Sequence, residues 1–500
     1  MRITLISPRL AVQKGDFLGS GVPYWPIELA TLATYLGEQG RSVSVIDLFG
    51  ADTGRLTDEG DHYLQGRPLS EILLESSITD ADAFVLYAIS YMSHGELLAI
   101  TRLLKTLRSG VPVAVLENSQ AVTAYSLARM ASAFFDAGAD LLICGEPYFN
   151  WPQIEAALLD PADSSVPANV MTPRTRGLPE RITVKEAPRY PIPAWDLFNL
   201  EGYWSIPYSH GPKTGRFLPI LTSRGCPYPC DFCVVPETNN KRWRGNAPEH
   251  VVDEIIALRD RHNVRHFQIE DLNPTVNSHR WDRIAQLLIE QRAGIFFYLV
   301  SGTKAETVPI ESVSLLARAG CRYISISPES GSKQLMKVIG KPFDYDYGLK
   351  LVTACRRHRI RTQACFLVGH PSETQADFQA SRRYLQQMIR AGLDEVAVFV
   401  VAPFAGSALF ANKRIAVNDG RALTSFSPKG RNDYTLLTTR RRQLIRLFFW
   451  EKLLKGPDLW MQGLRALFGR PQTKMENLPK RVLYIGWRIW RSRREGTAQA

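Results

Sequence analysis

The sequence predicts an α/β protein with a doubly wound N-terminal unit, a partial barrel of parallel strands and a basic helical tail. Two observations lead to this prediction. Short apolar runs alternate with helix-like patterns over residues 1–150, and they do so again over residues 216–415. The alternation then stops, and residues 416–500 become basic and aromatic. With 500 residues, the chain is long enough for two or three domains.

The N-terminal unit is predicted from eight apolar runs. Alternation of this kind is typical of a parallel sheet covered by helices on both faces, whose ligand cleft opens at the carboxyl ends of the strands. Residues 151–215 are rich in proline, which predicts a connecting segment. The runs are 3–6, 29–36, 43–49, 83–89, 97–107, 111–116, 127–135 and 141–144.

The second unit is predicted as a partial (β/α)6 barrel, because six strand-like runs alternate with helical patterns from residue 216 onward. In such a barrel the chemistry is carried by the loops that follow the carboxyl ends of the strands. The strand-like runs are 217–222, 266–270, 296–301, 323–327, 362–368 and 396–401.

The composition excludes several classes of protein. Hydrophobic residues make up 45% and charged residues 22%, which is typical of a globular chain. The seven cysteines are an odd number, so a disulfide framework is not expected. The first apolar run is too short for a secretory signal, and no stretch reaches 18 uninterrupted apolar residues. A cytoplasmic location is therefore expected.

The net charge of +12 belongs to the tail. Residues 425–500 carry 17 Lys and Arg against 5 Asp and Glu, which accounts for the whole excess and leaves the rest of the chain neutral. Any contact with an anionic surface is therefore expected through the C-terminal end.

Three cysteines carry the sharpest chemical signal. Cys226, Cys230 and Cys233 would share one face of a helix at this spacing, but Pro227 and Pro229 forbid a regular helix. The segment is therefore predicted to be a tight loop that gathers three thiolates around a metal or cluster. Zinc usually takes four ligands, whereas a four-iron cluster held by three thiolates leaves one iron open. The pattern favours the cluster; zinc and unligated structural cysteines are the alternatives.

With these residues the chain resembles the radical S-adenosylmethionine (SAM) enzymes. Their signature is C-x-x-x-C-x-x-C after the first barrel strand, with an aromatic residue before the last cysteine, and Cys226, Cys230, Phe232 and Cys233 match it. The resemblance implies that the three cysteines bind a catalytic 4Fe-4S cluster. It also implies that SAM chelates the open iron and is cleaved reductively to a 5′-deoxyadenosyl radical.

The same resemblance implies further cofactor-binding residues beside Phe232. Glu270 ends the second strand, the Glu329-Ser330-Gly331 run ends the fourth, and Gly369 begins a G-x-P-x-E-T-like turn after the fifth. Two of them have a simpler alternative, Glu329 as a capping carboxylate before a helix and Gly369 as the end of a strand. For Asp271, helix capping is favoured over catalysis.

The N-terminal unit resembles the domain of the cobalamin-binding radical SAM subclass, through residues 26–36 and 138–146. Residues 7–20 contain no histidine, so cobalamin would be bound without histidine on cobalt. Where the subclass has a Gly-Gly turn after the fourth strand, this chain has Glu117-Asn118-Ser119-Gln120, whose side chains narrow the approach of a bulky ligand. Bound cobalamin and a degenerate domain both stay open. A methylthiotransferase is disfavoured because only Cys144 precedes the motif.

The tail contains two basic aromatic segments, 439–450 and 481–491, that predict amphipathic helices. Such helices can lie in a membrane interface, and the alternative is that they pack on the barrel. A role in nucleic-acid binding is not favoured. We expect peripheral contact with the inner face of the membrane.

The expected function is that of a radical SAM enzyme that functionalises a C–H bond of a small molecule. Apolar compounds similar to lipids or tetrapyrroles, and secondary metabolites, are the substrates considered, and an external flavodoxin or ferredoxin is the expected electron donor. Cobalamin-dependent methyl transfer, as in a C-methyltransferase, is one outcome. The alternatives are a degenerate cobalamin domain with cyclisation or rearrangement chemistry, and a non-catalytic iron-sulfur scaffold or sensor.

Overall fold

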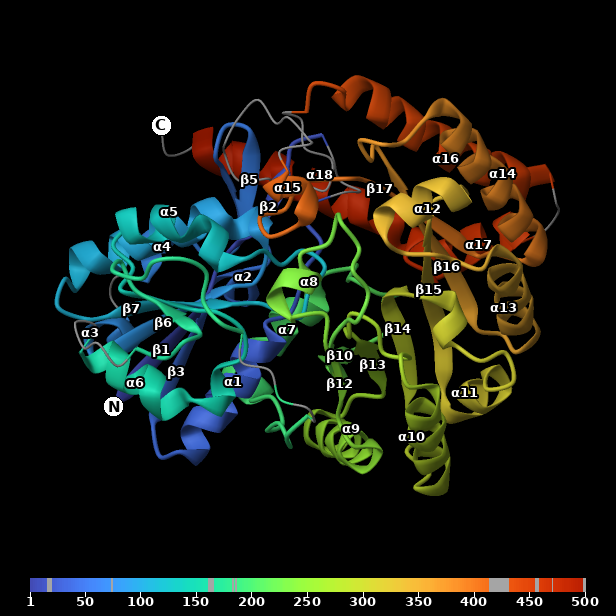
Figure 1. The fold of residues 1–500 in the computed structure, drawn as a ribbon. Coiled ribbons are helices and arrows are strands. Elements are labelled where there is room, and N and C mark those ends of the chain that lie inside the picture. The colour runs from blue at the N-terminus through green and yellow to red at the C-terminus, as the bar shows by residue number, and fades with distance from the viewer. Residues whose placement is uncertain are drawn as a thin grey trace.

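The computed structural model places two α/β units side by side, with the C-terminal helices along one side of both (Figure 1). It describes residues 1–15, 20–72, 75–160, 166–181, 184, 187–412, 431–454, 458–469 and 471–497.

The N-terminal unit is built on a six-stranded sheet in the order β3-β1-β6-β7-β8-β9, parallel except for β9. Its central strand β6 is buried along its whole length, as expected for a sheet covered on both faces. The strands are β1 (Arg2–Ser7), β3 (Ser42–Asp47), β6 (Ala83–Ala88), β7 (Val113–Glu117), β8 (Leu141–Ile143) and β9 (Val170–Met171), with a small antiparallel sheet of β2 (Leu10–Gln13), β4 (Leu56–Asp58) and β5 (His62–Gln65). The helices are α1 (Ile27–Glu38), α2 (Leu48–Ala51), α3 (Ser76–Thr79), α4 (His94–Leu107), α5 (Ala131–Asp136) and α6 (Trp151–Leu159).

Residues 151–215 do more than connect the two units. Strand β9 is the last strand of the N-terminal sheet, and helix α6 packs against β8 of that sheet. Helix α7 (Leu200–Ser205) contacts α2. The expected boundary at residue 150 therefore falls before the end of the unit. The reason is that β9, only two residues long, pairs antiparallel with β8 at the sheet edge, where a strand gives no alternating pattern in the sequence.

The second unit is a partial (β/α)6 barrel, as predicted. Its six strands are all parallel and follow chain order, β10-β13-β14-β15-β16-β17. The strands are β10 (Phe217–Ile220), β13 (His266–Ile269), β14 (Phe296–Thr303), β15 (Cys321–Glu329), β16 (Arg361–Val368) and β17 (Glu395–Val400), and an antiparallel hairpin is formed by β11 (Ser223–Gly225) and β12 (Trp243–Gly245). The helices are α8 (Val235–Thr238), α9 (Pro248–His262), α10 (Ser278–Glu290), α11 (Val313–Ala319), α12 (Lys333–Ile339), α13 (Tyr345–Arg357), α14 (Gln375–Ala391) and α15 (Ala408–Ala411).

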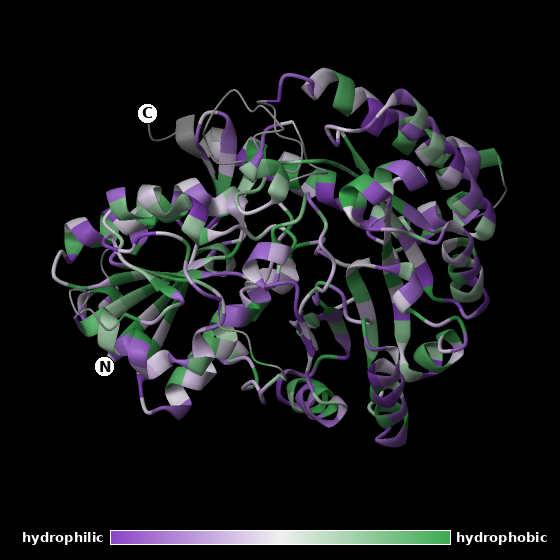
Figure 2. Cartoon of the chain, in the orientation of Figure 1, coloured by the Kyte–Doolittle hydropathy of each residue, from purple (hydrophilic) through white to green (hydrophobic). Residues whose placement is uncertain are grey.

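Local signals in the sequence fix the ends of several barrel helices. Helix α14 starts with a capping box between Thr374 and Asp377, and the side chains of Ser332 and Asp344 cap α12 and α13. Left-handed glycines, Gly340 and Gly392, end α12 and α14. Figure 2 shows the apolar strands enclosed by helices with polar outer faces.

The tail forms three helices that pack on both units. These are α16 (Tyr434–Leu454), α17 (Asp458–Leu467) and α18 (Leu478–Thr497). Helix α16 lies against β17 and α14 and buries Leu444 and Phe448 in the barrel core. Helix α18 reaches the N-terminal unit, where the Tyr484 hydroxyl donates to the Thr53 carbonyl. The expected start of the tail, residue 416, lies outside the described residues.

Within the described residues, no helix is both long enough and apolar enough to cross a membrane.

Candidate functional site

The three cysteines of the motif lie on one irregular loop at the carboxyl end of the first barrel strands. The loop leaves the β11–β12 hairpin at Gly225 and ends where α8 begins. No regular helix forms from residue 226 to residue 234, as the two prolines predict, and a turn is closed by the Cys233 amide, which donates to the Cys230 carbonyl at 3.2 Å. Cys226 and Cys233 pack against the same small apolar cluster around Val235.

A buried lysine partly offsets the effect of burial on these thiols. Burial raises the pKa of all three, to about 12 at Cys233, and the Lys341 ammonium opposes the rise at each. Lys341 Nζ also donates to Glu329 Oε1 at 2.6 Å, with both side chains almost fully buried. A positive charge therefore lies between a carboxylate and three candidate thiolates, and it favours their deprotonated, metal-binding form.

Within the described residues, no three His, Cys, Asp or Glu side chains are arranged to hold one metal ion. A single-ion site, including zinc, is therefore not supported. A four-iron cluster is different because its thiolates bind separate irons and need not converge on one point. Three thiols on one loop, close enough to raise one another's pKa, suit that donor set.

Glu329 has an unusual backbone. It has a φ of +58°, in the left-handed region that non-glycine residues rarely adopt, and the register between β15 and β16 shifts just before it. Strain of this kind persists only where the surrounding structure imposes it, and it gathers at functional sites. The carboxylate of Glu329 faces the central cavity together with Cys233 and Phe232.

This cavity has a volume of about 330 Å³, which lies at the lower end of the range for small-molecule sites. One wall comes from β17 and the segment after it, where the apolar residues Val398, Val400 and Phe404 contribute. A second wall comes from the tail, through Ile445 and Phe449 of α16 together with residues around the start of α18. The tail thus encloses the cavity, which the sequence did not predict.

Of the other acidic residues considered in the sequence analysis, Glu270 lies beside the cavity and Asp271 lies away from it. Glu270 lies next to the cavity, where its Oε2 is 2.6 Å from Nδ1 of His210, and His210 lines the cavity itself. Asp271, in contrast, accepts hydrogen bonds from the Thr222 amide and hydroxyl, both at 2.7 Å, and from the Ser223 hydroxyl. Asp271 is therefore a structural residue that fixes the turn between β10 and β11, rather than a helix cap.

Ser330, Gly331 and Gly369 lie outside the cavity lining. Gly331 is required by a close approach, because a Cβ there would be 2.3 Å from the Ala380 carbonyl oxygen of α14. Gly369 has a φ of +86° and packs against Leu437 of the tail. These residues support the loops rather than face the cavity.

Two residues of the site were missed by the sequence analysis. Lys341 follows the left-handed Gly340, which abuts the cysteine loop at Pro229, and nothing in the local pattern indicates the pairing with Glu329. His210 comes from the segment expected to be a connection, and it meets Glu270 only through the fold.

An open cleft of about 770 Å³ lies at the cysteine loop and is bordered by Cys230, Cys233, Arg129 and Lys241. It gives the cysteine loop a second exposed side, separate from the walls formed by β17 and the tail.

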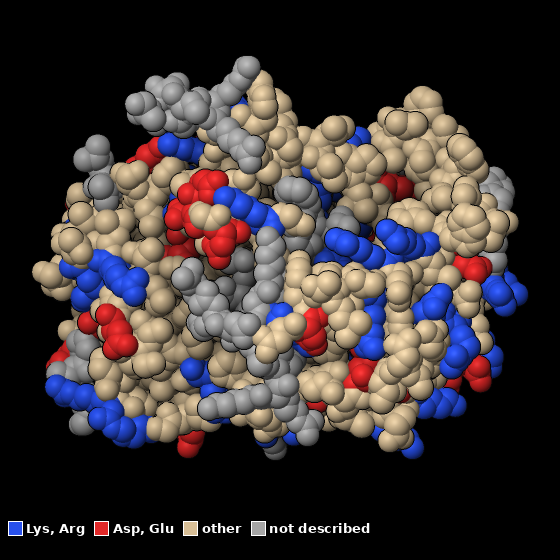
Figure 3. Space-filling view, turned by 90° about the horizontal axis from the view of Figure 1, so that it is seen from above, with Lys and Arg blue, Asp and Glu red and all other residues tan. Residues whose placement is uncertain are grey.

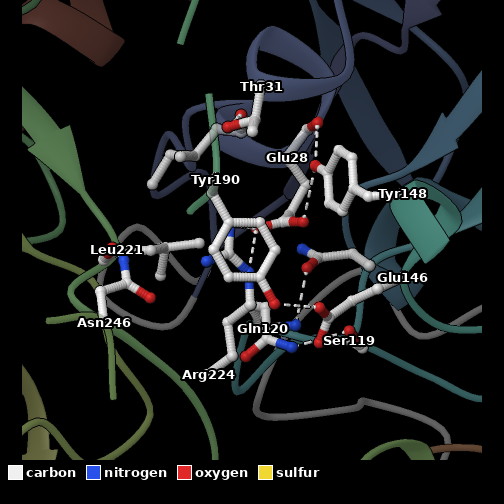
Figure 4. Close-up of polar contacts among 12 residues, drawn as sticks. Glu28, Thr31, Ser119, Gln120, Glu146, Tyr148, Tyr190, Leu221, Arg224 and Asn246 are labelled. Carbon is white, nitrogen blue, oxygen red and sulfur yellow. Dashed lines mark hydrogen bonds and ion pairs between the residues drawn. The ribbon is translucent and has the colours of Figure 1, made fainter. Parts of the chain in front are cut away.

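The carboxyl edge of the N-terminal sheet faces the cysteine loop across a buried polar network (Figure 4). Arg224, two residues before Cys226, pairs with Glu28 at 2.8 Å and lies 3.3 Å from the centre of the Tyr190 ring. Arg244 of β12 pairs with Glu146. The 117–120 segment is part of the same interface, because Gln120 Oε1 accepts from the Gly225 amide at 2.9 Å.

Comparison with known proteins agrees with this geometry. Residues 220–385 match the model of the Radical SAM superfamily. The chain is 28% identical to cytidylyl-2-hydroxyethylphosphonate methyltransferase of Streptomyces wedmorensis over 45% of this chain and 43% of that protein. It is 24% identical to anaerobic magnesium-protoporphyrin IX monomethyl ester cyclase of Synechocystis over 52% and 50%. The match thus spans about half the length of each relative.

Among solved structures, the radical SAM methyltransferase TsrM of Kitasatospora setae, with cobalamin and a 4Fe-4S cluster bound, aligns with a TM-score of 0.61. The alignment covers 83% of this chain and 78% of TsrM at 17% identity, so the likeness is one of fold. Residues 220–385 thus match the radical SAM superfamily, and the overall fold is similar to that of TsrM.

Proposed function

We propose that this chain is an enzyme that cleaves SAM reductively in the central cavity and uses the resulting radical to abstract a hydrogen atom from an apolar small molecule. The observation that carries the proposal is the shared cavity, where Cys233 and the strained Glu329 face an apolar wall. A bound 4Fe-4S cluster would supply the one electron that splits SAM into methionine and the 5′-deoxyadenosyl radical.

The residues of the chain would prepare this cavity in three ways. Cys226, Cys230 and Cys233 would hold three irons of the cluster and leave the fourth open to SAM. Lys341 keeps the surroundings of the thiolates positive and orients Glu329 by their 2.6 Å hydrogen bond. Glu329 and the Glu270–His210 pair supply polar groups at the carboxyl ends of β15 and β13, where the amino and hydroxyl groups of SAM would be bound.

The substrate class follows from the walls. Most of the lining from β17 and α16 is aliphatic or aromatic, which suits an apolar molecule. The polar groups of the tail side, among them Arg441, Lys474 and Arg481, would bind one anionic substituent of such a substrate. The magnesium-protoporphyrin cyclase among the relatives acts on a tetrapyrrole, and this supports the same class.

Two reactions could follow hydrogen abstraction: methyl transfer, as the names of two relatives state for those proteins, and cyclisation or rearrangement. The 117–120 segment favours the second, because its side chains bond to the cysteine loop at the edge of the N-terminal sheet, where methyl transfer from methylcobalamin would need room for that cofactor. The external electron donor would meet the cluster at the open cleft, where Cys230 and Cys233 border solvent.

The test of the proposed function is anaerobic reconstitution with iron and sulfide, followed by reduction with dithionite in the presence of SAM. We expect about four irons per chain and formation of 5′-deoxyadenosine. Cys226→Ala/Cys230→Ala/Cys233→Ala should lose both, whereas Cys355→Ala, a matched buried cysteine of α13, should keep both. Unchanged iron content in the triple variant would overturn the proposal.

Peripheral membrane contact is a separate proposal, which the exposed tail supports. The large side chains Trp460, Leu464, Leu467 and Phe468 recur on one face of α17 and its end, and each is more than half exposed. The tail is also the basic part of the chain, and Lys and Arg appear in several patches on the side seen from above (Figure 3). An anionic lipid surface satisfies both features, because aromatic side chains enter the interface and each nearby basic residue adds about 1 kcal/mol.

Removal of the tail would not test this contact, because α16 and α18 pack on the barrel and on the N-terminal unit. Trp460→Glu/Leu464→Glu leaves this packing in place. We expect the variant to lose co-sedimentation with anionic vesicles, while the parent chain binds less at high salt. Leu159→Glu, which changes an exposed leucine of α6, is the control. If the α17 variant and the parent chain co-sediment equally with anionic vesicles, the proposed membrane contact is contradicted.

A further inference from the structure

The carboxyl edge of the N-terminal sheet is where a doubly wound domain binds its ligand, at the point where the strand order reverses. Here the reversal lies between β1 and β6, since β3 is placed on one side of β1 and β6 on the other. The cavity at this point is bordered by Ser7 and Ser90 and has a volume of only about 20 Å³. A second cavity, beside Tyr87 and Gln120, holds about 30 Å³.

Among the described residues, these two cavities are too small for a large cofactor. A space of this size holds one or two water molecules, whereas pockets for drug-sized ligands measure about 300 Å³ or more. Cobalamin, with its corrin ring and nucleotide, is larger than a drug-sized ligand. The open cleft at the cysteine loop is lined by residues that follow β7 and β9 and by the loop itself, and it does not reach the ends of β1 and β6. The central cavity does reach this edge, at Tyr24 and Val122, but its volume of about 330 Å³ is that of a drug-sized site.

Buried protein side chains pack at the carboxyl edge of the N-terminal sheet. At the start of α4, the His94 ring packs nearly perpendicular to the rings of Tyr125 and Phe134, and its Nδ1 lies 3.1 Å from the Tyr125 hydroxyl. Burial lowers the pKa of His94 to about 4, so the ring is neutral at physiological pH. Beside it, Arg9 pairs with Glu96, and both side chains are buried. These buried side chains thus contact other protein groups rather than an open cavity.

The 117–120 segment was expected to narrow the approach of a bulky ligand. In the structure it is buried and bonds to the end of β6 and to the cysteine loop. All four side chains are at most 5% exposed. The Asn118 amide donates to the Ile89 carbonyl at 2.9 Å, and this holds the segment to the end of β6. Gln120 accepts from the Gly225 amide, and its Nε2 donates to Asn239 Oδ1 at 3.1 Å. Gln120 thus bonds to both sides of the cysteine loop, just before Cys226 and at the end of α8.

We propose that the N-terminal unit does not hold cobalamin and that its 117–120 segment, through Gln120, is instead a positioning clamp for the cysteine loop. The described residues at the sheet edge do not fit cobalamin, because the cavities there are small and the buried polar side chains around them pair with other protein groups. The clamp rests on the proposed cluster at the three cysteines, whereas the exclusion of cobalamin is independent of it.

The exclusion is tested with the full chain and hydroxocobalamin. After incubation and gel filtration, we expect no cobalt to elute with the protein and no shift of the corrin absorbance bands. One equivalent of cobalt eluting with the chain would overturn the exclusion, whatever the chain does with SAM. This result does not depend on the cluster, so its failure is distinct from a failure of the proposed function.

The clamp is tested with Gln120→Ala, Gln120→Glu and Gln153→Ala in the reconstituted chain. Glu keeps the oxygen that accepts from Gly225, and Gln153 is an exposed residue of α6 in the same unit. We expect Gln120→Ala to lose iron to a chelator about fivefold faster, which corresponds to one hydrogen bond of about 1 kcal/mol, with an altered paramagnetic spectrum of the reduced cluster.

We expect Gln120→Glu, which keeps the acceptor for Gly225 but loses the donor to Asn239, to restore part of the spectrum, and Gln153→Ala to match the parent. Thermal unfolding of the iron-free proteins separates a general loss of stability from a local effect. If Gln120→Ala keeps the parent spectrum and rate of iron loss, the clamp is refuted.

Discussion

Replacement of Arg224 by methionine tests the interface between the two units. Arg224 Nε and Nη2 lie 3.1 and 2.8 Å from the same oxygen of Glu28, and both side chains are almost fully buried. Removal of one partner of a buried pair leaves an uncompensated charge and costs about 3–5 kcal/mol. The Tyr148 hydroxyl still donates to Glu28 at 3.0 Å, so the lower part of this range is expected.

The loss should depend on pH, because burial already raises the pKa of Glu28 above 4.5 and Arg224 opposes that rise. Without Arg224 the pKa rises further, so the folded variant retains a proton that the unfolded chain releases. The stability deficit is therefore smallest in acid and grows as the pH rises above the raised pKa that Glu28 has in the folded parent. Glu28→Leu/Arg224→Met removes both charges, and it should recover most of the loss and all of this pH dependence.

The assay is urea unfolding of parent, single and double variants, followed by tryptophan fluorescence and circular dichroism. A 500-residue chain need not unfold in one step, so the transition whose midpoint moves is compared between variants. A single variant that loses less than about 1 kcal/mol, or a double variant as unstable as the single one, would refute the reasoning.

Two further predictions concern single residues. Burial raises the pKa of Asp47 to about 6 from 3.8, so the folded parent loses stability relative to Asp47→Asn as the pH rises from about 4 to about 6, by at most about 3 kcal/mol in unfolding experiments at each pH. Gly225→Ala should prevent iron loading, measured as iron per chain, because its Cβ would lie 2.0 Å from the Arg242 carbonyl oxygen at a φ of +77°. Gly95→Ala, where nothing lies within 4 Å, should load normally, and a loaded Gly225→Ala would contradict the backbone argument.

Local patterns were sufficient for the architecture and for the cysteine loop. Buried parallel strands and capped helices leave a regular pattern of apolar residues in the sequence, so the five parallel strands of the N-terminal sheet and the six barrel strands could be predicted from it. Two prolines were enough to predict that Cys226, Cys230 and Cys233 lie on a loop rather than a helix.

The remainder depends on contacts between distant residues. Lys341 and Glu329 meet through a turn after α12, and Glu270 meets His210 across 60 residues of chain. The tail shows the same limit. Its basic, aromatic composition predicted helices, but only the fold places Ile445 and Phe449 in the wall of the cavity. The two-residue strand β9 was missed because it is too short to show a period.

The most direct test of the central claim is electron paramagnetic resonance of the reduced, reconstituted chain before and after addition of SAM. If three thiolates hold a four-iron cluster whose open iron faces the cavity, the spectrum should show one reduced 4Fe-4S species and change when SAM binds to it. The change should be weakened in Glu329→Gln, because that carboxylate faces the same cavity. A cluster spectrum that SAM leaves unchanged, or no cluster spectrum, would contradict the account.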